Sequence, residues 1–262
     1  MSSDAVTLAT DSRGVATLTL NRPDVHNAFD DALIAELDRL LARVADDAGV
    51  RVVMLAAAGK SFSAGADLNW MRRMAGYDEQ QNVDDALRLA RLLRRLDRLP
   101  KPTVARVQGA ALGGGVGLVA CCDIALAARS AVFALSEVRL GLIPATISPY
   151  LVAAMGARAA RRYVLTGERF GADDALRLGL VHEVADDHAL ATAVESVVAS
   201  LLQGGPASIA DAKELIAHVA ATANDQALLT ETARRIARAR ASAEGREGIA
   251  AFLDKRKPRW DR

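Results

Sequence analysis

The feature that most constrains the fold is a repeated alternation of short apolar runs with longer segments of helical periodicity. Val52 to Ala56 and Thr103 to Val107 have the pattern of buried strands, and each is followed by a glycine-containing loop and then by a helical pattern. Between them, apolar residues recur at helical spacing as far as Leu99, where Pro100 ends the pattern. Strands that alternate with helices in this way predict an α/β fold with crossover connections.

The two ends of the chain depart from this alternation. Near the N-terminus, the β-branched runs Val6 to Ala9 and Val15 to Leu20 flank a turn-forming sequence and predict a β-hairpin. From about Val194 onward the pattern is almost entirely helical. We therefore predict a core over residues 1–200 and a C-terminal helical region over residues 201–262.

Charge and composition limit the kinds of partner that the protein is expected to bind and the cell compartment in which it is expected to work. Lys and Arg number 33 against 32 Asp and Glu, so no overall field attracts nucleic acid or an anionic membrane. No apolar segment reaches the roughly 18–20 residues of a membrane span, and Met1 to Thr10 lacks the basic and apolar regions of a targeting segment. Cys121 and Cys122 are adjacent in an apolar stretch, which is typical of buried, reduced thiols. These features predict a cytoplasmic protein.

Two glycine-containing loops follow strands, at residues 64–67 and 108–117. The second loop has neither the position nor the spacing of a dinucleotide-binding loop, and Gly59-Lys60-Ser61 lacks the upstream glycine of a phosphate-binding loop. The histidines have no metal-ligand spacing, so no metal site is predicted. A glycine run at a helix start can instead bring backbone N–H groups to a ligand oxygen.

A thioester is a suitable ligand for such N–H groups. When its α-carbon gains carbanion character, negative charge accumulates on the carbonyl oxygen, and two fixed donors stabilise that enolate more than the ground state. The glycine loops therefore point to acyl-thioester chemistry.

Four motifs resemble the enoyl-CoA hydratase/isomerase (crotonase) superfamily in order and spacing. They are Phe62 to Leu68, Gln108 to Gly115, Cys122 to Ile124 and Ser136 to Pro144. The resemblance covers nearly the whole chain and implies a crotonase spiral of β-β-α units, followed by C-terminal helices that pack in a homotrimer or a dimer of trimers. It also implies an acyl-CoA thioester substrate that brings coenzyme A as part of itself, with no prosthetic group.

The resemblance assigns roles to individual residues. Glu137 is the expected catalytic carboxylate, and the backbone N–H groups of Ala66 and Gly114 are the expected oxyanion hole. The residues expected to contact coenzyme A are Arg22, Val25, His26, Ala64, Gly65, Ala66, Asp67, Leu68, Gly113, Gly114, Phe252 and Lys255. In relatives, the last two are often donated by a neighbouring subunit. For Asp67 itself, a helix cap is the favoured role.

Two departures from the family pattern bear on the reaction. Typical hydratases carry a second glutamate where this chain has Gly117, and residues 145–149 replace a glycine-rich stretch beside the attacking water. Single-glutamate members resemble either methylglutaconyl-CoA hydratases or Δ3,Δ2-enoyl-CoA isomerases, in which a lone base moves a proton. Residues 64–71 and 136–150 look more like the first group.

The sequence therefore predicts hydration of a 3-methylglutaconyl-CoA-like α,β-unsaturated acyl-CoA, with an isomerase as the alternative. An RNA-binding module is the least favoured hypothesis, because the net charge is near zero and aromatic residues make up only 4% of the chain.

Overall fold

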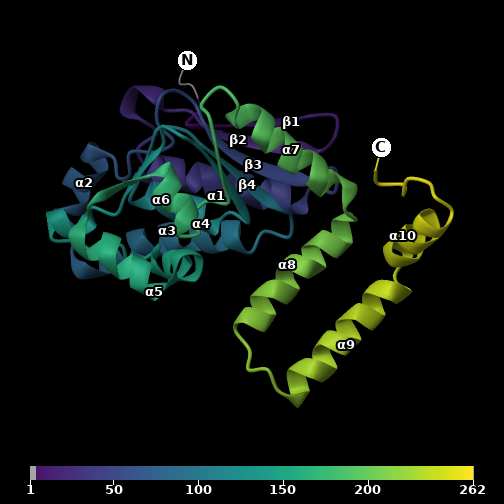
Figure 1. The fold of residues 1–262 in the computed structure, drawn as a ribbon. Coiled ribbons are helices and arrows are strands. Elements are labelled where there is room, and N and C mark those ends of the chain that lie inside the picture. Colours follow the sequence, from purple (N-terminus) through teal and green to yellow (C-terminus); the bar gives the residue numbers. More distant parts are fainter. Residues whose placement is uncertain (1–3, 262) are drawn as a thin grey trace.

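A sheet covered on both faces forms the centre of the structure, a computed structural model that describes residues 4–261 (Figure 1). Its strands lie in the order β1 (Val6–Thr10), β2 (Val15–Leu20), β3 (Val52–Ala57), β4 (Thr103–Val107), β6 (Ile124–Ala128) and β9 (Glu183–Ala185). β1 and β2 form the predicted antiparallel hairpin, with Val6 opposite Leu20, and the later neighbours are parallel. The predicted α/β architecture is confirmed.

Successive residues of the central strands point to opposite faces of the sheet. Val52 and Val104 pack toward α7 (Leu190–Gln203) on one face. Leu55 and its neighbours on the other face join the core beneath α1 (Asp31–Asp46), α3 (Glu79–Asp97) and α4 (Gly114–Cys121). Because both faces are buried, these strands appear in the sequence as continuous apolar runs.

A smaller sheet completes the β-β-α spiral. It consists of β5 (Ala110–Leu112), β7 (Val132–Ala134) and β8 (Arg169–Gly171). The chain passes from β4 in the large sheet to β5 in the small one, returns through α4 to β6, and then enters β7. The sequence does not predict β5, β8 or β9, because three residues are too few to show a strand period.

Five further elements border the glycine loops or follow them. They are η1 (Pro23–Val25), α2 (Leu68–Met74), η2 (Glu137–Leu140), α5 (Ser148–Thr166) and α6 (Ala172–Arg177). Gly156 interrupts α5 with φ 74° and ψ 153°. Asp30 caps the start of α1, where its side chain accepts a hydrogen bond from the N–H of Leu33.

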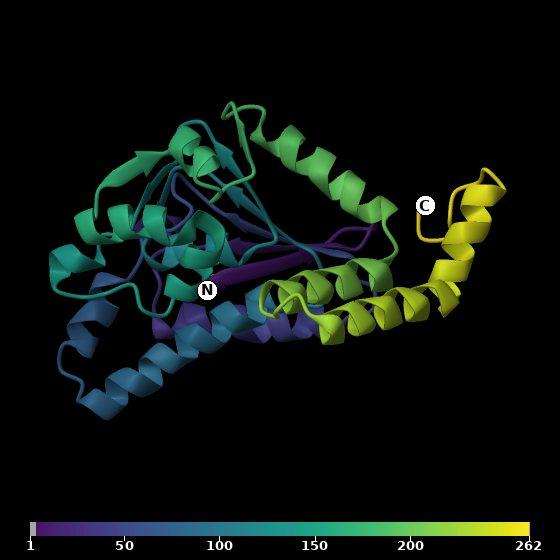
Figure 2. The same ribbon diagram turned by 60° about the horizontal axis from the view of Figure 1, so that its bottom comes forward.

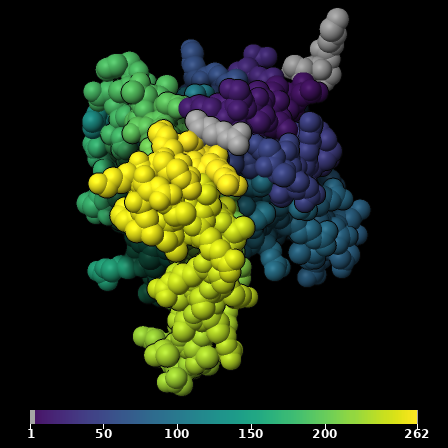
Figure 3. Space-filling view, turned by 90° about the vertical axis from the view of Figure 1, so that its right-hand side faces the viewer, coloured from purple at the N-terminus to yellow at the C-terminus, as the bar shows by residue number. Residues whose placement is uncertain are grey.

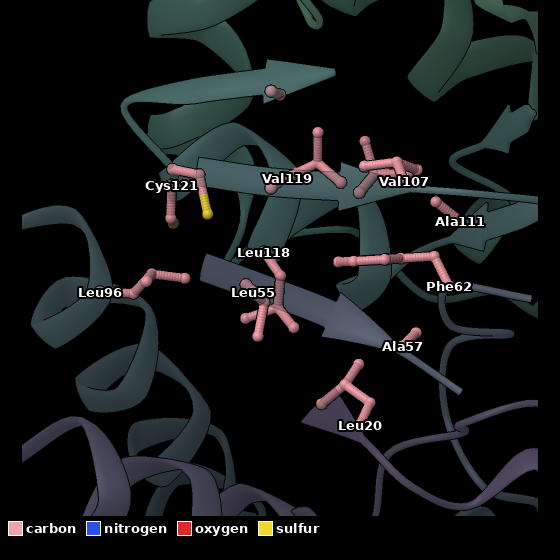
Figure 4. Close-up of a cluster of buried hydrophobic side chains, with 14 of the residues drawn as sticks. Leu20, Leu55, Ala57, Phe62, Leu96, Val107, Ala111, Leu118, Val119 and Cys121 are labelled. Atoms are coloured by element: carbon pink, nitrogen blue, oxygen red, sulfur yellow. The ribbon is translucent and has the colours of Figure 1, made fainter. Parts of the chain in front are cut away.

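The main core lies where α3 and α4 meet the strands (Figure 4). Leu96 of α3, Leu118 of α4 and Leu55 of β3 converge there with Phe62, which follows the loop after β3. The thiols of Cys121 and Cys122 are buried and unpaired, as predicted, and burial raises the pKa of both, that of Cys122 to about 12.

The last helices extend away from this core (Figures 1 and 2). α8 (Pro206–Ala220), α9 (Gln226–Ala241) and α10 (Ala243–Leu253) form an arm in which only Leu228 and Ala251 are buried among the described residues. In Figure 3, α10 lies on the face turned to the viewer and α9 extends below it. Lys213 ties α8 to the core by donating to Asp123 over 2.8 Å. α7 packs on the sheet as far as Leu202, and the division at residues 200 and 201 stays a prediction.

No helix between residues 4 and 261 has both the length and the apolar composition needed to cross a membrane. The N-terminal segment in which the sequence predicts no targeting signal begins with three residues that lie outside the described range. The cytoplasmic location stays a prediction.

Candidate active site

The loop that carries Ala66 is fixed by the backbone of Phe29. The N–H of Phe29 donates to the carbonyl of Gly65 over 2.7 Å, and the N–H of Asp67 donates to the carbonyl of Phe29 over 2.7 Å. These two bonds hold Ala66 in a parallel bridge without using its own N–H. No residue between 4 and 261 accepts a hydrogen bond from that N–H, which leaves it available to a ligand.

Asp67 closes this loop as a helix cap, as its favoured role predicted. Its carboxylate accepts hydrogen bonds from the N–H groups of Asn69 and Trp70 at the start of α2. Partial burial acts to raise the pKa of Asp67, but these two N–H groups and the guanidinium of Arg22 together hold it below its ordinary value. The carboxylate is therefore engaged in structure.

The second glycine loop turns sharply into α4. Gly113 has φ 51° and ψ −117°, a conformation that residues with a Cβ rarely adopt. Its N–H donates to the carbonyl of Ala134 over 2.9 Å, and α4 begins at Gly114. The N–H of a first helical residue has no acceptor inside its own helix, and none from the rest of the described chain reaches Gly114.

Close contacts bring the two glycine loops together. The N–H of Leu112 donates to the carbonyl of Ser63 over 2.9 Å, and Ser63 forms a parallel bridge with Ala111. The ring of Phe29 lies against Gly114, where an added Cβ would be 2.6 Å from its Cε2. Phe29 thus touches Ala66 with its backbone and Gly114 with its ring.

Glu137 faces the second loop from the start of η2. A Cβ at Gly113 would lie 3.0 Å from its Oε1. Its Oε2 is buried and has no hydrogen-bond partner among residues 4–261. Burial raises the pKa of this carboxyl, an effect that a hydrogen bond from its own backbone N–H only partly offsets. A carboxyl of this kind, beside free N–H groups at a helix start, is a candidate proton carrier.

The segment from Arg22 to His26 lies beside the first glycine loop. The N–H of Ala64 donates to the carbonyl of His26 over 2.9 Å, and His26 Nδ1 lies 3.1 Å from Ser61 Oγ. The side chains of Val25 and Leu68 are exposed on this side. The structure therefore groups most of the residues expected to contact coenzyme A.

The guanidinium of Arg22 has partners within the chain. It forms ion pairs with Asp30 over 2.9 Å and with Asp67 over 3.0 Å, so it joins the caps of α1 and α2. It also donates to the carbonyl of Ala28. A contact between Arg22 and coenzyme A stays a prediction. Its ion pairs with Asp30 and Asp67 already give Arg22 a structural role.

Two of the expected coenzyme A contacts are not near the site within one chain. Phe252 lies in the last turn of α10 with 83% of its surface exposed, and Lys255 lies just beyond the end of this helix. In Figures 1 and 2 this end of the arm lies on the opposite side of the molecule from α2. Their participation requires a second copy of the chain.

The comparisons with known proteins agree with this geometry. The model of the enoyl-CoA hydratase/isomerase family matches residues 10–262. The chain belongs to this family, the crotonase superfamily. As a crotonase it is an enzyme of the enoyl-CoA hydratase/isomerase type, with a CoA thioester as substrate.

Three crotonases illustrate the similarity. The enoyl-CoA hydratase from Shewanella pealeana ATCC 700345 is 48% identical, with a TM-score of 0.95 over 98% of this chain and 96% of its own. That from Mycobacterium smegmatis is 36% identical, with a TM-score of 0.94 over 99% and 100%. The 1,2-epoxyphenylacetyl-CoA isomerase from Escherichia coli (strain K12) is 35% identical over 95% of each chain. Close relatives therefore include both hydratases and an isomerase.

Sequence reasoning missed three residues that shape this crotonase site: Asn27, Phe29 and Ser63. Ser63 Oγ donates to the carbonyl of Asn27 over 2.9 Å, and both residues are fully buried. Asn27 has a positive φ of 53°, which asparagine tolerates better than most residues. The available signal was a polar residue, Ser63, inside an otherwise apolar and glycine-containing motif.

The sequence predicts that this crotonase uses no metal ion and no prosthetic group. Among the described residues, no three His, Cys, Asp or Glu side chains are grouped so that they could hold a metal ion. That no metal or prosthetic group takes part stays a prediction.

Proposed function

We propose that the chain hydrates an α,β-unsaturated acyl-CoA, with Glu137 as the only proton carrier and the N–H groups of Ala66 and Gly114 as the oxyanion hole. The observation that carries the proposal is the buried, unpartnered Oε2 of Glu137 beside a loop whose helix-start N–H groups are free. The two N–H groups supply stabilisation where charge develops, and the carboxylate supplies the base.

In this mechanism Glu137 accepts a proton from water as the water oxygen bonds to C3. The electron pair of the C2–C3 double bond moves toward the thioester, and the N–H groups of Ala66 and Gly114 stabilise the resulting enolate oxygen. Glu137 then returns a proton to C2, which restores the carboxylate. The net change is addition of one water molecule.

An isomerase is the second candidate, because no carboxylate occupies position 117. In that reaction Glu137 removes a proton from C2 of a 3-enoyl-CoA and returns it to C4, through a dienolate whose oxygen the same two N–H groups hold. The isomerase among the relatives agrees with this alternative.

Oxygen-18 water separates the two reactions. The purified protein is incubated with 2-enoyl-CoA and with 3-enoyl-CoA, and the products are analysed by mass spectrometry. Label in a 3-hydroxyacyl-CoA supports hydration, whereas unlabelled 2-enoyl-CoA formed from the 3-enoyl-CoA supports isomerisation. No turnover of any enoyl-CoA would contradict both.

For the acyl group we propose a branched, carboxylate-ended chain like that of 3-methylglutaconyl-CoA. Trp70 on α2, just beyond the Ala66 loop, has a buried indole N–H with no partner among residues 4–261, and a ligand acceptor would satisfy it. A panel of acyl-CoAs tests this, and kcat/KM is expected to be highest for the diacid. An equal value for a neutral analogue of the same shape would contradict the assignment.

The pH dependence follows from the buried state of Glu137. The base must be ionised, and burial raises its pKa above the ordinary value of 4.5. We therefore expect kcat/KM to fall as the pH drops through a value above 4.5, where an exposed glutamate would still be ionised. The measurement is kcat/KM from pH 4 to pH 9 (roughly the range in which carboxyl and imidazole groups titrate), and an acid limb at or below the ordinary value would contradict it.

The arm supports a homotrimer or a dimer of trimers. Large apolar side chains are exposed at helical spacing along it: Ile216 and Val219 on α8, Leu229 and Ile236 on α9, and Ile249, Phe252 and Leu253 on α10. Apolar faces of this extent usually mark a protein interface. Assembly would also bring Phe252 and Lys255 of one copy toward the site of another.

The paired change Phe252→Glu and Leu253→Glu is expected to weaken assembly by about 2 kcal/mol or more, or about 30-fold in the dissociation constant, because charges replace buried apolar contacts. Light scattering after size-exclusion chromatography measures the mass. As a control, Leu165→Glu places the same change at an exposed leucine of α5, outside the arm. A monomeric wild type with full activity would contradict the assembly.

A further inference from the structure

At the start of α4, two glycines leave one side of the helix without side chains. Gly113 and Gly117 are four residues apart, and the N–H of Gly117 donates to the carbonyl of Gly113 over 3.2 Å. Residues at this spacing lie on the same side of a helix, one turn apart. Glu137 covers the first glycine, with its Oε1 3.0 Å from the position of a Cβ.

Ile147 covers the second glycine. A Cβ on Gly117 would overlap Ile147 Cγ2 and lie 3.0 Å from Ile147 Cβ, and it would also touch Leu93 Cδ2 at 3.7 Å. Ile147 is 2% exposed and Leu93 is fully buried, so the contact is closed to solvent. Neither a side chain at position 117 nor a water molecule has room there.

Both departures from the family pattern, at Gly117 and within residues 145–149, therefore meet in one contact. Position 117 has no side chain, and Ile147 fills the space that a side chain would need. This contact lies one turn along α4 from Gly113, the glycine that Glu137 covers, and the side chains that form it, Ile147 and Leu93, are apolar.

We propose that Ile147 is a specificity-determining residue, which limits the water beside Glu137 and so sets the balance between hydration and double-bond migration. The proposal rests on the proposed function and deepens it. Both reactions place an enolate oxygen on the same two N–H groups, but the anions differ: removal of a proton from C2 of a 3-enoyl-CoA gives a dienolate, and addition of water to C3 of a 2-enoyl-CoA gives a 3-hydroxy enolate. The 2-enoyl-CoA formed by isomerisation therefore either leaves the site or is hydrated there. A shorter side chain at 147 admits water, which favours the route that adds it.

The first test measures the products formed from one 3-enoyl-CoA, as the ratio of 3-hydroxyacyl-CoA to 2-enoyl-CoA at early times. This ratio comes from the active molecules alone, so a partly unfolded preparation does not change it. We expect Ile147→Ala to raise the ratio by about fivefold or more. The control Ile147→Val, which removes one methyl group, is expected to change it less than about twofold.

An unchanged ratio in Ile147→Ala would overturn the proposal. So would a wild type that hydrates without releasing any 2-enoyl-CoA, because water would then not be limiting. A wild type with no activity on any enoyl-CoA would contradict the proposed function instead. The second test does not depend on activity and still shows whether Ile147 packs against Gly117.

The second test is a double-mutant cycle on thermal unfolding. Gly117→Ala is expected to lower Tm by about 5 °C, because its Cβ overlaps Ile147. In the Ile147→Ala background the same change is expected to leave Tm unchanged or raise it, because alanine favours a helix over glycine. An equal decrease in both backgrounds would show that Ile147 does not occupy this space and would overturn the proposal.

Discussion

Replacing Glu137 with glutamine is expected to lower kcat by about 10³- to 10⁴-fold, the upper range for loss of a general acid–base group. The change keeps the size of the side chain but removes the carboxylate that faces Gly113. Since one residue carries every proton in the proposed mechanism, no second group can compensate. Steady-state kinetics with an enoyl-CoA measures the effect.

The same variant is expected to be as stable as the wild type or more stable at neutral pH. Burial raises the pKa of Glu137, which means that its ionised form destabilises the folded state. Glutamine carries no charge, and each kcal/mol gained would raise Tm by roughly 2–4 °C. This advantage should disappear as the pH falls below the raised pKa, where the wild-type carboxyl is itself neutral.

Glu36→Gln is the matched control. Glu36 lies on the surface of α1 and pairs with Arg39, so its loss should leave kcat unchanged. A Glu137→Gln variant that keeps wild-type kcat would remove Glu137 from the mechanism. A large loss of stability in that variant would instead indicate that the carboxylate has a structural partner.

Gly113→Ala is expected to lower kcat/KM by about 100-fold or more. Its φ of 51° and ψ of −117° force a residue with a Cβ into a strained conformation, at a cost of about 1–3 kcal/mol. The new Cβ would also press on Glu137 Oε1 and turn the first N–H groups of α4 away from the enolate oxygen. Kinetics and thermal unfolding are measured on the same preparation.

Gly156→Ala is the control that separates the effect of backbone strain on stability from the effect of Gly113→Ala on catalysis. Gly156 also has a positive φ, of 74°, but outside its own helix backbone no atom of residues 4–261 lies within 4 Å of the position of its Cβ. We expect a loss of stability similar to that of Gly113→Ala, with kcat/KM changed less than about twofold. Equal losses of activity in the two variants would mean that the effect at Gly113 is only loss of folded protein.

The large sheet was predictable except for β9, because its other strands are long enough to show a pattern. β2 and β4 have the predicted bounds, and β1 differs by one residue. In the small sheet, β5 and β8 were not predicted because three residues show no period, and both pair with the strand that begins at Val132. That contact depends on tertiary structure, which no local period reports.

Some parts of the site were predictable from the sequence and others were not. Motifs identified the loops around Ala66 and Gly114 and the position of Glu137, and the structure brings the three segments together. The sequence did not show that Arg22 pairs with two aspartates, because ion pairs across 8 and 45 residues leave no periodic signal. The exposed end of α10 was expected at the site, but one chain alone does not bring it there.

Phe29 has a consequence for how such a site can change. Its main chain fixes the neighbourhood of one donor and its ring supports the other, so the volume of this side chain contributes to the distance between the two donors. A smaller residue at position 29 would alter that gap without touching the reactants. Evolution could thus tune the enzyme to enolates of different shape by repacking a buried ring, while every group that handles protons stays the same.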